Sequence, residues 1–311
     1  MWTAAEIVDR LRERGELWEP VRGAVGLRGE TLRLYEELAA AIGTLTRSVA
    51  EEEWRVPAVL DFASLARADY FASFPQWLTV ASHLSSDPGR LERLARSADP
   101  AGLVGAMSDP CEAALPPAVC YHVYPRFAGQ RVDSPTLVTV EGTCWRHEGK
   151  RLFPLERGWA FTMREVVCLG TRDAVETFRR RGIAATRALL ATLGLGGEVL
   201  PATDPFFAPT ARGRRILQAL KGLKHELRLP SGPAADLAAA SFNHHENFFG
   251  EAFKIRLPDG TPAASGCVAF GLERWLLAFL ATHGPDSAAW PSIFPDTPWK
   301  RTVSNPMEEA S

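Results

Sequence analysis

The sequence predicts an α+β fold in which a mostly antiparallel sheet is flanked by helices. Segments rich in β-branched and aromatic residues recur along the 311-residue chain, without the regular alternation with helices that a parallel sheet requires. Hydrophobic residues make up 46% of the chain, which is ample for a substantial core. Length alone allows one large domain or two ordinary ones.

Helices are expected in the first part of the chain. The segments Ala4–Gly15 and Arg28–Trp54 read as helices, and the second carries apolar residues at roughly helical spacing. Its charged residues lie mostly elsewhere, so one of its faces should pack on a larger body. Residues 1–55 are therefore predicted to be a helical segment that packs on a catalytic domain spanning residues 56–311. Shorter elements are expected at Ala58–Ala66, Pro88–Leu94 and Ala101–Met107 as helices and at Tyr70–Pro75 as an extended piece.

The sheet is expected to come from the rest of the chain. Runs of β-branched and aromatic residues predict its strands. These strands are Ala118–Tyr124, Val132–Trp145 with Thr143–His147 as its motif-bearing end, Trp159–Leu169, Glu198–Ala202, Glu226–Leu229, Leu237–Phe242, Phe253–Leu257 and Ala263–Phe270. Helices are predicted over Thr171–Leu193, which Gly194 ends, over the basic segment Thr210–His225, and over Leu272–Thr282. The tail from Pro291 is expected to be irregular.

Composition excludes several classes of protein. The net charge of −2 does not suit a chain that neutralises many phosphates of a nucleic acid. No apolar run approaches the roughly 20 residues of a membrane-spanning helix, and the N-terminus is too charged for a signal peptide. A soluble, cytoplasmic protein is expected. The five cysteines are dispersed and odd in number, which does not indicate a disulfide framework.

Two neighbouring strands, joined by a loop rich in turn residues, carry an unusual mixture of side chains. Arg146 and Glu148 are two residues apart, so they should project from one face of the first strand. Phe161, Met163 and Glu165 should share one face of the second. Unpaired charges are expensive to bury, so this is a poor core face. It suits a ligand that is part aromatic base, part polyanion and part ammonium.

These residues resemble a known family. An Arg-x-Glu at Arg146 and Glu148, a variable loop and an aromatic residue at Phe161 resemble motif 2 of the class II aminoacyl-tRNA synthetases, and Gly271-Leu-Glu-Arg274 resembles motif 3. The best match is to the amino acid:carrier protein ligases, which look like a seryl-tRNA synthetase core without a tRNA-binding arm. The segments that fit that family, spread over most of the chain, are Leu115–Tyr124, Phe161–Glu165, Ser241–Gly250 and Gly266–Trp275.

The resemblance implies a class II catalytic fold. The segment before motif 1 is too short for the long coiled-coil arm of seryl-tRNA synthetases, so no tRNA-binding arm is expected. Pro75 follows a helix-then-strand pattern and resembles the motif 1 proline, which implies a homodimer. An ordinary turn proline would explain Pro75 equally well.

The resemblance also implies ATP as a substrate. Arg146 would grip the α-phosphate with its forked guanidinium, Glu148 would contact the adenine amino group, and Phe161 would stack on the base. Arg274 would cover the other face of adenine and reach the γ-phosphate. Magnesium is expected with ATP, and Glu226 is a candidate ligand for it. A lone arginine is more often part of a surface salt bridge, but two arginines stand in two matching motifs.

A zinc site is the sharper implication. Cys120, Glu165 and Cys267 fall where the ligases and the atypical seryl-tRNA synthetases hold zinc ligands, and no spacing rule links them. Three protein ligands would leave a fourth position open for the α-amino group of the substrate. The alternative is two buried structural cysteines and a salt-bridged glutamate. Asn243 matches a segment that lines the substrate pocket. Its neighbours His244 and His245 should point to opposite faces, so a second metal site there is not expected.

The leading functional hypothesis is an ATP- and zinc-dependent ligase. It would activate a small amino acid, glycine or alanine by family analogy, and transfer it to the phosphopantetheine thiol of a carrier protein. The basic segment could dock an acidic carrier through Arg212, Arg214, Arg215 and Lys221, although a solvated charged face explains it as well. One alternative is a reduced seryl-type synthetase that charges tRNA. The other is a paralogue without catalysis, which the presence of the motif residues disfavours.

Overall fold

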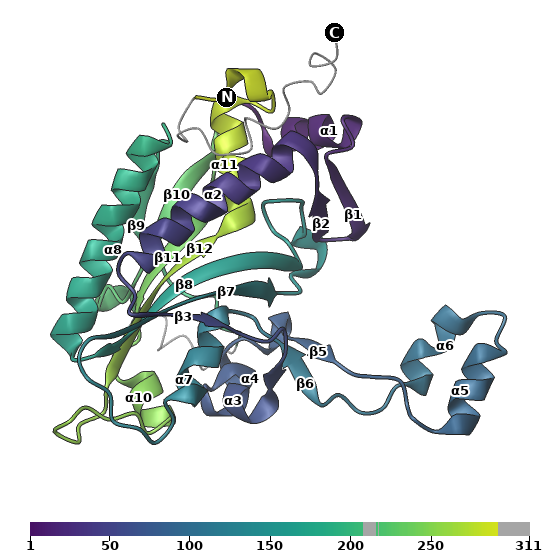
Figure 1. The fold of residues 1–311 in the computed structure, drawn as a ribbon, viewed down its shortest axis with the longest axis horizontal. Coiled ribbons are helices and arrows are strands. Elements are labelled where there is room, and N and C mark those ends of the chain that lie inside the picture. The colour runs from purple at the N-terminus through teal and green to yellow at the C-terminus, as the bar shows by residue number, and fades with distance from the viewer. Residues whose placement is uncertain (208–215, 217, 292–311) are drawn as a thin grey trace, which may run out of the picture.

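The structure is a computed structural model that describes residues 1–207, 216 and 218–291. In this part of the chain a seven-stranded sheet has the spatial order β3-β7-β8-β12-β11-β10-β9 (Figure 1). β3 runs parallel to β7 and every other neighbouring pair is antiparallel, which confirms the predicted sheet type. The strands are β3 (Glu52–Arg55), β7 (Thr136–Trp145), β8 (Ala160–Gly170), β9 (Glu198–Pro201), β10 (Lys224–Gly232), β11 (Ala235–His244) and β12 (Ala264–Gly271).

One face of this sheet is covered by the longer helices (Figure 1). They are α1 (Ala4–Glu13), α2 (Gly29–Arg47), α8 (Arg172–Thr192) and α11 (Leu272–His283). Val166 of β8, Phe242 of β11 and Trp275 of α11 are buried together in the resulting core. Successive strand residues point to opposite faces, so the next residues along these strands point away from the helices. The largest group of charged side chains expected from the sequence, including Arg146, Glu165 and Arg274, lies on that second face.

Short elements cover the second face. They are the 3₁₀ helix η2 (Val119–His122) and the helices α3 (Phe62–Arg67), α4 (Tyr70–Ser73), α7 (Val123–Arg126) and α10 (Phe248–Ala252). Tyr124, Val167 and Phe253 belong to the core between this layer and the sheet. Two smaller sheets complete the architecture. One is a hairpin of β1 (Leu17–Val21) and β2 (Ala24–Leu27), and the other joins β4 (Leu60–Asp61), β6 (Ala113–Leu115) and β5 (Thr79–Ala81) in that order.

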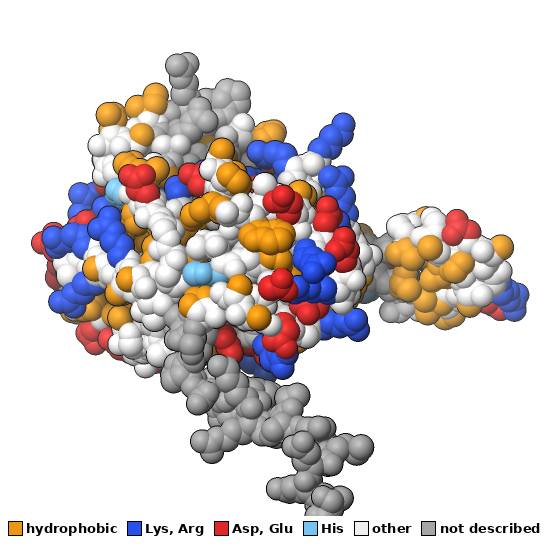
Figure 2. Space-filling model, turned by 90° about the horizontal axis from the view of Figure 1, so that it is seen from above, with side chains coloured by type: hydrophobic (Ala, Val, Ile, Leu, Met, Phe, Trp, Pro, Cys, Tyr) orange, Lys and Arg blue, Asp and Glu red, His pale blue; other side chains and the backbone are white. Residues whose placement is uncertain are grey.

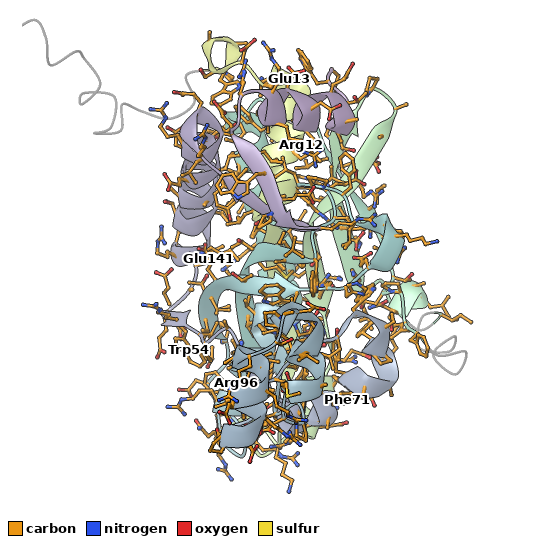
Figure 3. All side chains as sticks on the ribbon, turned by 90° about the vertical axis from the view of Figure 1, so that its right-hand side faces the viewer. Arg12, Glu13, Trp54, Phe71, Arg96 and Glu141 are labelled. Atoms are coloured by element: carbon orange, nitrogen blue, oxygen red, sulfur yellow. The ribbon has the colours of Figure 1, made fainter. Side chains whose placement is uncertain are left out.

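The parallel edge of the large sheet is fastened by a buried arginine. Arg164 of β8 is only 4% exposed. Its guanidinium pairs with Glu53 of β3 and with Glu141 of β7 at 3.1 Å, and its Nε donates to Thr46 Oγ1 of α2 at 2.7 Å. Figure 3 shows Glu141 on the same side of the molecule as Trp54 of β3. The N-terminal segment is thereby tied into the main sheet as well as into the helical layer.

A pair of helices projects from the body. They are α5 (Pro88–Ala95) and α6 (Pro100–Met107), which lie far to the right in Figure 1. No residue of α5 is buried and α6 buries only Met107. Figure 2 shows hydrophobic side chains gathered on this projection, where Leu91 and Val104 are 41% and 47% exposed. Figure 3 places Arg96 on it, at the opposite end of the molecule from Arg12 and Glu13 of α1.

Several predicted elements are wrong. Ala118–Tyr124 is not a strand, because after the extended residue Ala118 the chain turns into η2 and α7. Its apolar side chains Val119 and Val123 are spaced for one helical face, and both are fully buried. Phe253–Leu257 is also no strand, since α10 precedes it and the segment itself contains only two isolated bridges, both at Arg256.

Helix boundaries also differ from the predictions. The helix predicted over Arg28–Trp54 ends at Arg47, and Trp54 belongs to β3. Tyr70–Pro75 is not extended, because α4 occupies Tyr70–Ser73 and Pro75 starts a 3₁₀ helix, η1 (Pro75–Trp77). A helix, then a strand, then a proline is instead the order of α2, β3 and Pro57.

The basic segment Thr210–His225 lies partly outside the described residues. Its last two residues, Lys224 and His225, form the start of β10 and not the end of a helix. Within the described ranges, no helix combines the length and the apolar composition that crossing a membrane requires.

Candidate functional site

A cavity of about 760 Å³ opens on the face of the sheet that the long helices leave free. Its floor comes from β8, β10, β11 and β12, and its walls come from the segments around Phe74, Pro117, Arg157 and Pro205. Every site residue expected from the sequence lines it. They are Cys120, Arg146, Glu148, Phe161, Glu165, Glu226, Asn243, Cys267 and Arg274. The fold thus brings residues as far apart in sequence as Cys120 and Arg274 to the same cavity.

The strand register arranges the floor in rows. Lys224 of β10 lies opposite Asn243 of β11, which lies opposite Cys267 of β12. Since directly opposite residues point to the same face, these three side chains form one row. A second row runs from Glu226 through Ser241 and Ala269 to Glu165 of β8. Glu165 and Cys267 therefore sit diagonally across the β8–β12 pair.

Cys120, Glu165 and Cys267 converge at one end of the floor. Each offers one ligand atom, and these atoms all lie within 4.8 Å of one another. Cys120 reaches the group from η2, so the wrongly predicted strand still delivers its thiol to the site. Glu165 is 1% exposed, and its Oε1 has no hydrogen-bond partner within the described part of the chain. A buried carboxylate oxygen without a partner is costly, and a bound cation would satisfy it.

The donor set suits zinc. Zinc binds thiolate sulfur at about 2.3 Å and carboxylate oxygen at about 2.0–2.2 Å, usually with four ligands in a tetrahedron. Burial raises the pKa of Glu165 to about 8, with Cys267 as a further cause. A hydrogen bond with Cys267, together with burial, raises the pKa of Cys120, and the hydrogen bond from Cys120 lowers the pKa of Cys267. A divalent cation would favour the ionised form of all three groups.

Cys267 has further polar neighbours. Asn243 Nδ2 donates to Cys267 Sγ at 3.3 Å and to Ser241 Oγ at 3.1 Å. His245 Nε2 lies 3.9 Å from the same sulfur. His244 instead accepts at Nδ1 from the backbone N–H of Glu246 at 2.9 Å. Among the described residues, neither histidine belongs to a cluster of groups that could hold a metal.

Arg146 directly follows Trp145, the last residue of β7, and lines the cavity. Its Nε donates to the backbone carbonyl of Pro117 at 2.9 Å. Its guanidinium carbon lies 5.6 Å from the ring centre of Trp77 and 5.5 Å from that of Phe161. Within the described residues it forms no ion pair with a carboxylate, so its charge remains available to a ligand.

Glu148 does not project from a strand, because β7 ends at Trp145 and Glu148 precedes the 3₁₀ helix η3 (Gly149–Arg151). Its buried carboxylate pairs with Arg157 at 2.5 Å and with Arg151 at 3.5 Å. These two loop arginines line the cavity and were not singled out from the sequence. Their position in a variable loop gave no signal for this pairing.

Arg274 lies in the first turn of α11, directly after the floor strand β12. Its Nε and Nη1 donate to the backbone carbonyls of Glu156 and Ala238 at 2.7 and 2.6 Å. Burial, together with the nearby Arg157 and Arg146, lowers the pKa of Arg274 to about 10. Beside it, a Cβ on Gly271 would meet only Arg274 Cδ at 3.8 Å and Ala239 O at 4.0 Å. Three arginines thus concentrate positive charge near this end of the cavity, as a polyanion requires.

Glu226 is already engaged. Its carboxylate lies 3.1 Å from Lys224 Nζ and 3.9 Å from Arg228, and Lys224 also pairs with Asp204 at 2.5 Å. Lys224 and Asp204 are cavity residues that sequence reasoning missed. Of the residues expected to dock a carrier, Arg212, Arg214 and Arg215 lie outside the described part of the chain. Lys221 pairs with Glu246 at 3.0 Å.

The fold is that of the catalytic cores of class II aminoacyl-tRNA synthetases. The crystal structure of M. kandleri seryl-tRNA synthetase in complex with A. aeolicus tRNASec matches with a TM-score of 0.81 at 23% identity, covering 92% of this chain and 59% of that chain. The type-2 serine–tRNA ligase of Methanopyrus kandleri is 25% identical over 312 residues, covering 92% of this chain and 58% of the relative. The class II fold expected from the sequence is confirmed.

A more similar relative defines the family. Amino acid–[acyl-carrier-protein] ligase 1 of Bradyrhizobium diazoefficiens is 34% identical over 297 residues, which span 93% of this chain and 90% of the relative. The chain therefore belongs to the amino acid–[acyl-carrier-protein] ligases, and the family resemblance found in the sequence is confirmed. No protein-family model matches the chain.

Proposed function

We propose that this protein activates glycine or alanine with ATP and transfers the aminoacyl group to the phosphopantetheine thiol of a carrier protein. Membership of the ligase family supports aminoacylation of a carrier. The observation that carries the proposal is the cavity itself, where the Cys120–Glu165–Cys267 cluster and the arginines Arg146 and Arg274 line one space. An amine and a triphosphate could be held together there.

The first step joins the amino acid to AMP. The amino acid carboxylate attacks the α-phosphorus of ATP, a P–O bond forms, and pyrophosphate leaves. Arg146 would stabilise the charge on the α-phosphate, and its lack of a carboxylate partner in the described chain leaves it free to do so. Phe161 and Arg274 would hold the adenine between them, while magnesium would accompany the phosphates. No protein nucleophile is needed, because positioning and charge stabilisation lower the barrier.

Glu148 would receive the adenine amino group. In the structure its carboxylate pairs with Arg157 and Arg151, so nucleotide binding would have to share or displace these contacts. Glu226 is a poor magnesium ligand as it stands, because Lys224 neutralises its charge at 3.1 Å. Magnesium held mainly by phosphate oxygens and water would fit this cavity better.

The Cys120–Glu165–Cys267 group would select the substrate through the ion that it holds. Zinc held by Cys120, Glu165 and Cys267 would supply an open coordination position for an unprotonated α-amino group. Asn243, which donates to Cys267 at 3.3 Å, would orient that thiolate and border the amino acid. In the second step the thiol of the carrier attacks the acyl carbon. A thioester forms, AMP leaves, and the thiol proton is released.

Pyrophosphate exchange with a panel of amino acids tests the first step. Exchange with glycine or alanine and none with larger amino acids is expected, and the Arg146→Ala variant should abolish it. The second step is tested by transfer to a holo carrier protein, with the same carrier lacking phosphopantetheine as the control. An enzyme that exchanges pyrophosphate but aminoacylates only tRNA would favour the alternative that the 25% identity to a type-2 serine–tRNA ligase suggests.

Three further points belong to the proposal. The enzyme acts as a homodimer in the cytoplasm, which sedimentation and fractionation would test. Residues 1–55 and 56–311 form the packing segment and the catalytic domain. The carrier docks near Lys221 and the neighbouring Arg212, Arg214 and Arg215, so Lys221→Glu should raise the KM for the carrier and leave pyrophosphate exchange unchanged. Lys254→Glu, away from that segment in sequence, is the control.

A further inference from the structure

The guanidinium of Arg146 lies over two aromatic rings. Its carbon is 5.6 Å from the ring centre of Trp77 and 5.5 Å from that of Phe161. The only hydrogen bonds of this guanidinium within the described residues go to the Pro117 carbonyl and to the sulfur of Met163 at 3.9 Å. A guanidinium on such flat surfaces is oriented by them, because the ring faces attract the cation and restrict its rotation. The position of Trp77 therefore decides where the fork of Arg146 points.

Trp77 is itself the end of a column of rings. Phe74 stacks on it with ring centres 5.7 Å apart and planes 6° apart. Phe206 also stacks with Phe74, with ring centres 5.1 Å apart and planes 20° apart. All three are half-buried and line the cavity. Phe206 comes from the segment after β9, so the column joins parts of the chain that are far apart in sequence.

The outer end of the column is anchored by a half-buried ion pair. Asp204, two residues before Phe206, pairs with Lys224 of the cavity floor at 2.5 Å. Its backbone N–H and its carboxylate both bond to Gln218 at 2.7 Å. The backbone N–H of Phe207 donates to the carbonyl of Ser73 at 2.9 Å. These contacts fix the segment on both sides of Phe206.

We propose that Phe206, held by Asp204 and Lys224, is a positioning residue that orients Arg146 through Phe74 and Trp77. Removing the Phe206 ring deprives Phe74 of one of its two stacking partners, and the loosened column lets Trp77 and the guanidinium move. The guanidinium of Arg146 then has no fixed orientation toward the phosphates, and ATP binds more weakly. This inference rests on the proposed function only in taking ATP as the ligand of Arg146.

The test is a double-mutant cycle read by equilibrium binding of magnesium ATP to the full-length protein. Phe206→Ala should weaken binding about fivefold, the size of one aromatic contact. In an Arg146→Lys background, which keeps the charge but not the planar fork, Phe206→Ala should have almost no further effect. Phe206→Tyr, which keeps the ring, should bind as the wild type does. Phe207→Ala is the matched control, because Phe207 is the next residue along the chain and its side chain is 63% exposed.

Other outcomes overturn the proposal. It is wrong if Phe206→Ala binds ATP normally, or weakens binding equally in both backgrounds, since a general structural role would do the latter. Thermal unfolding checks the variants, and Phe206→Leu replaces Phe206→Ala if the smaller side chain prevents folding. Asp204→Asn should repeat the loss of affinity. A protein that binds ATP but never exchanges pyrophosphate would refute the proposed function alone, whereas a wild type that binds no ATP would refute both.

Discussion

Asn243 and Cys267 face each other across β11 and β12, and the Asn243 amide donates to the Cys267 sulfur at 3.3 Å. A hydrogen bond to a thiolate stabilises its charged form and fixes its direction. We expect Asn243→Ala to weaken zinc binding by about 10- to 100-fold, as loss of an outer partner of a metal ligand typically does. Competition with a chromogenic chelator measures this directly. Ser241→Ala removes the other acceptor of the same amide and should change the affinity much less.

Removal of a ligand itself should abolish the metal. Cys120→Ala and Cys267→Ala are each expected to leave a purified protein with almost no zinc and no pyrophosphate exchange. Cys168→Ala is the matched control, because Cys168 is equally buried but lies in the core against the helices. Metal analysis of the three variants decides the question. Full zinc content in either ligand variant would show that the cluster is not the metal site.

Two glycines of β12 should respond in opposite ways to one added methyl group. A Cβ on Gly271 meets nothing closer than 3.8 Å and the residue lines the cavity, so Gly271→Ala should fold normally. We expect its KM for ATP to rise about tenfold, because the methyl group occupies ligand space. A Cβ on Gly266 would lie 2.6 Å from Asn243 O and 2.7 Å from Val175 Cγ1, so Gly266→Ala should lower the melting temperature. Equal melting temperatures and equal KM values would contradict both expectations.

Glu273 should make stability depend on pH. Burial raises its pKa to about 7, while both carboxylate oxygens accept from the backbone N–H of Thr162 at 2.9 Å. Between pH 4.5 and 7 the unfolded chain releases this proton and the folded chain keeps it, so its contribution to the free energy of unfolding falls as the pH rises. Below that window the cost is absent, and above it the cost is constant.

The Glu273→Gln variant removes this titration. We expect the variant to gain stability relative to the wild type by roughly 1–3 kcal/mol between pH 4.5 and pH 8, as urea unfolding at each pH would show. Glu13→Gln, at an exposed site on α1, is the control. A constant difference between the stability curves of the Glu273→Gln variant and the wild type would mean that Glu273 is ionised throughout.

The sequence predicted the sheet better than its surroundings. The run predicted over Trp159–Leu169 is rich in β-branched and aromatic residues, and the observed strand, Ala160–Gly170, differs from it by one residue at each end. Ala118–Tyr124 has a similar composition but folds as η2 and α7, because neighbours distant in sequence bury its side chains. Composition alone cannot separate a buried strand from a buried helical segment of this length.

The site shows the same division. Family motifs brought Arg146, Glu165 and Arg274 to notice, and the fold places all three around one cavity. Arg157, Lys224 and Asp204 line it too, but they stand in no motif, and a charged residue on a loop or a strand end is usually a solvated one. Their roles depend on contacts with Glu148 and Glu226 that only the tertiary structure creates.

The register that sets Cys267 beside Glu165 makes the site tolerant of one kind of change and intolerant of another. A substitution on the cavity floor changes the chemistry of one side chain, while the backbone hydrogen bonds between the strands keep its position. Losing a single residue between Ala264 and Cys267 would instead shift the register by one, so that Val268 would point toward the cavity and the Cys267 thiol toward the helices. Over evolutionary time, such a site can acquire new substrates by substitution, whereas an insertion or deletion within β12 would destroy it.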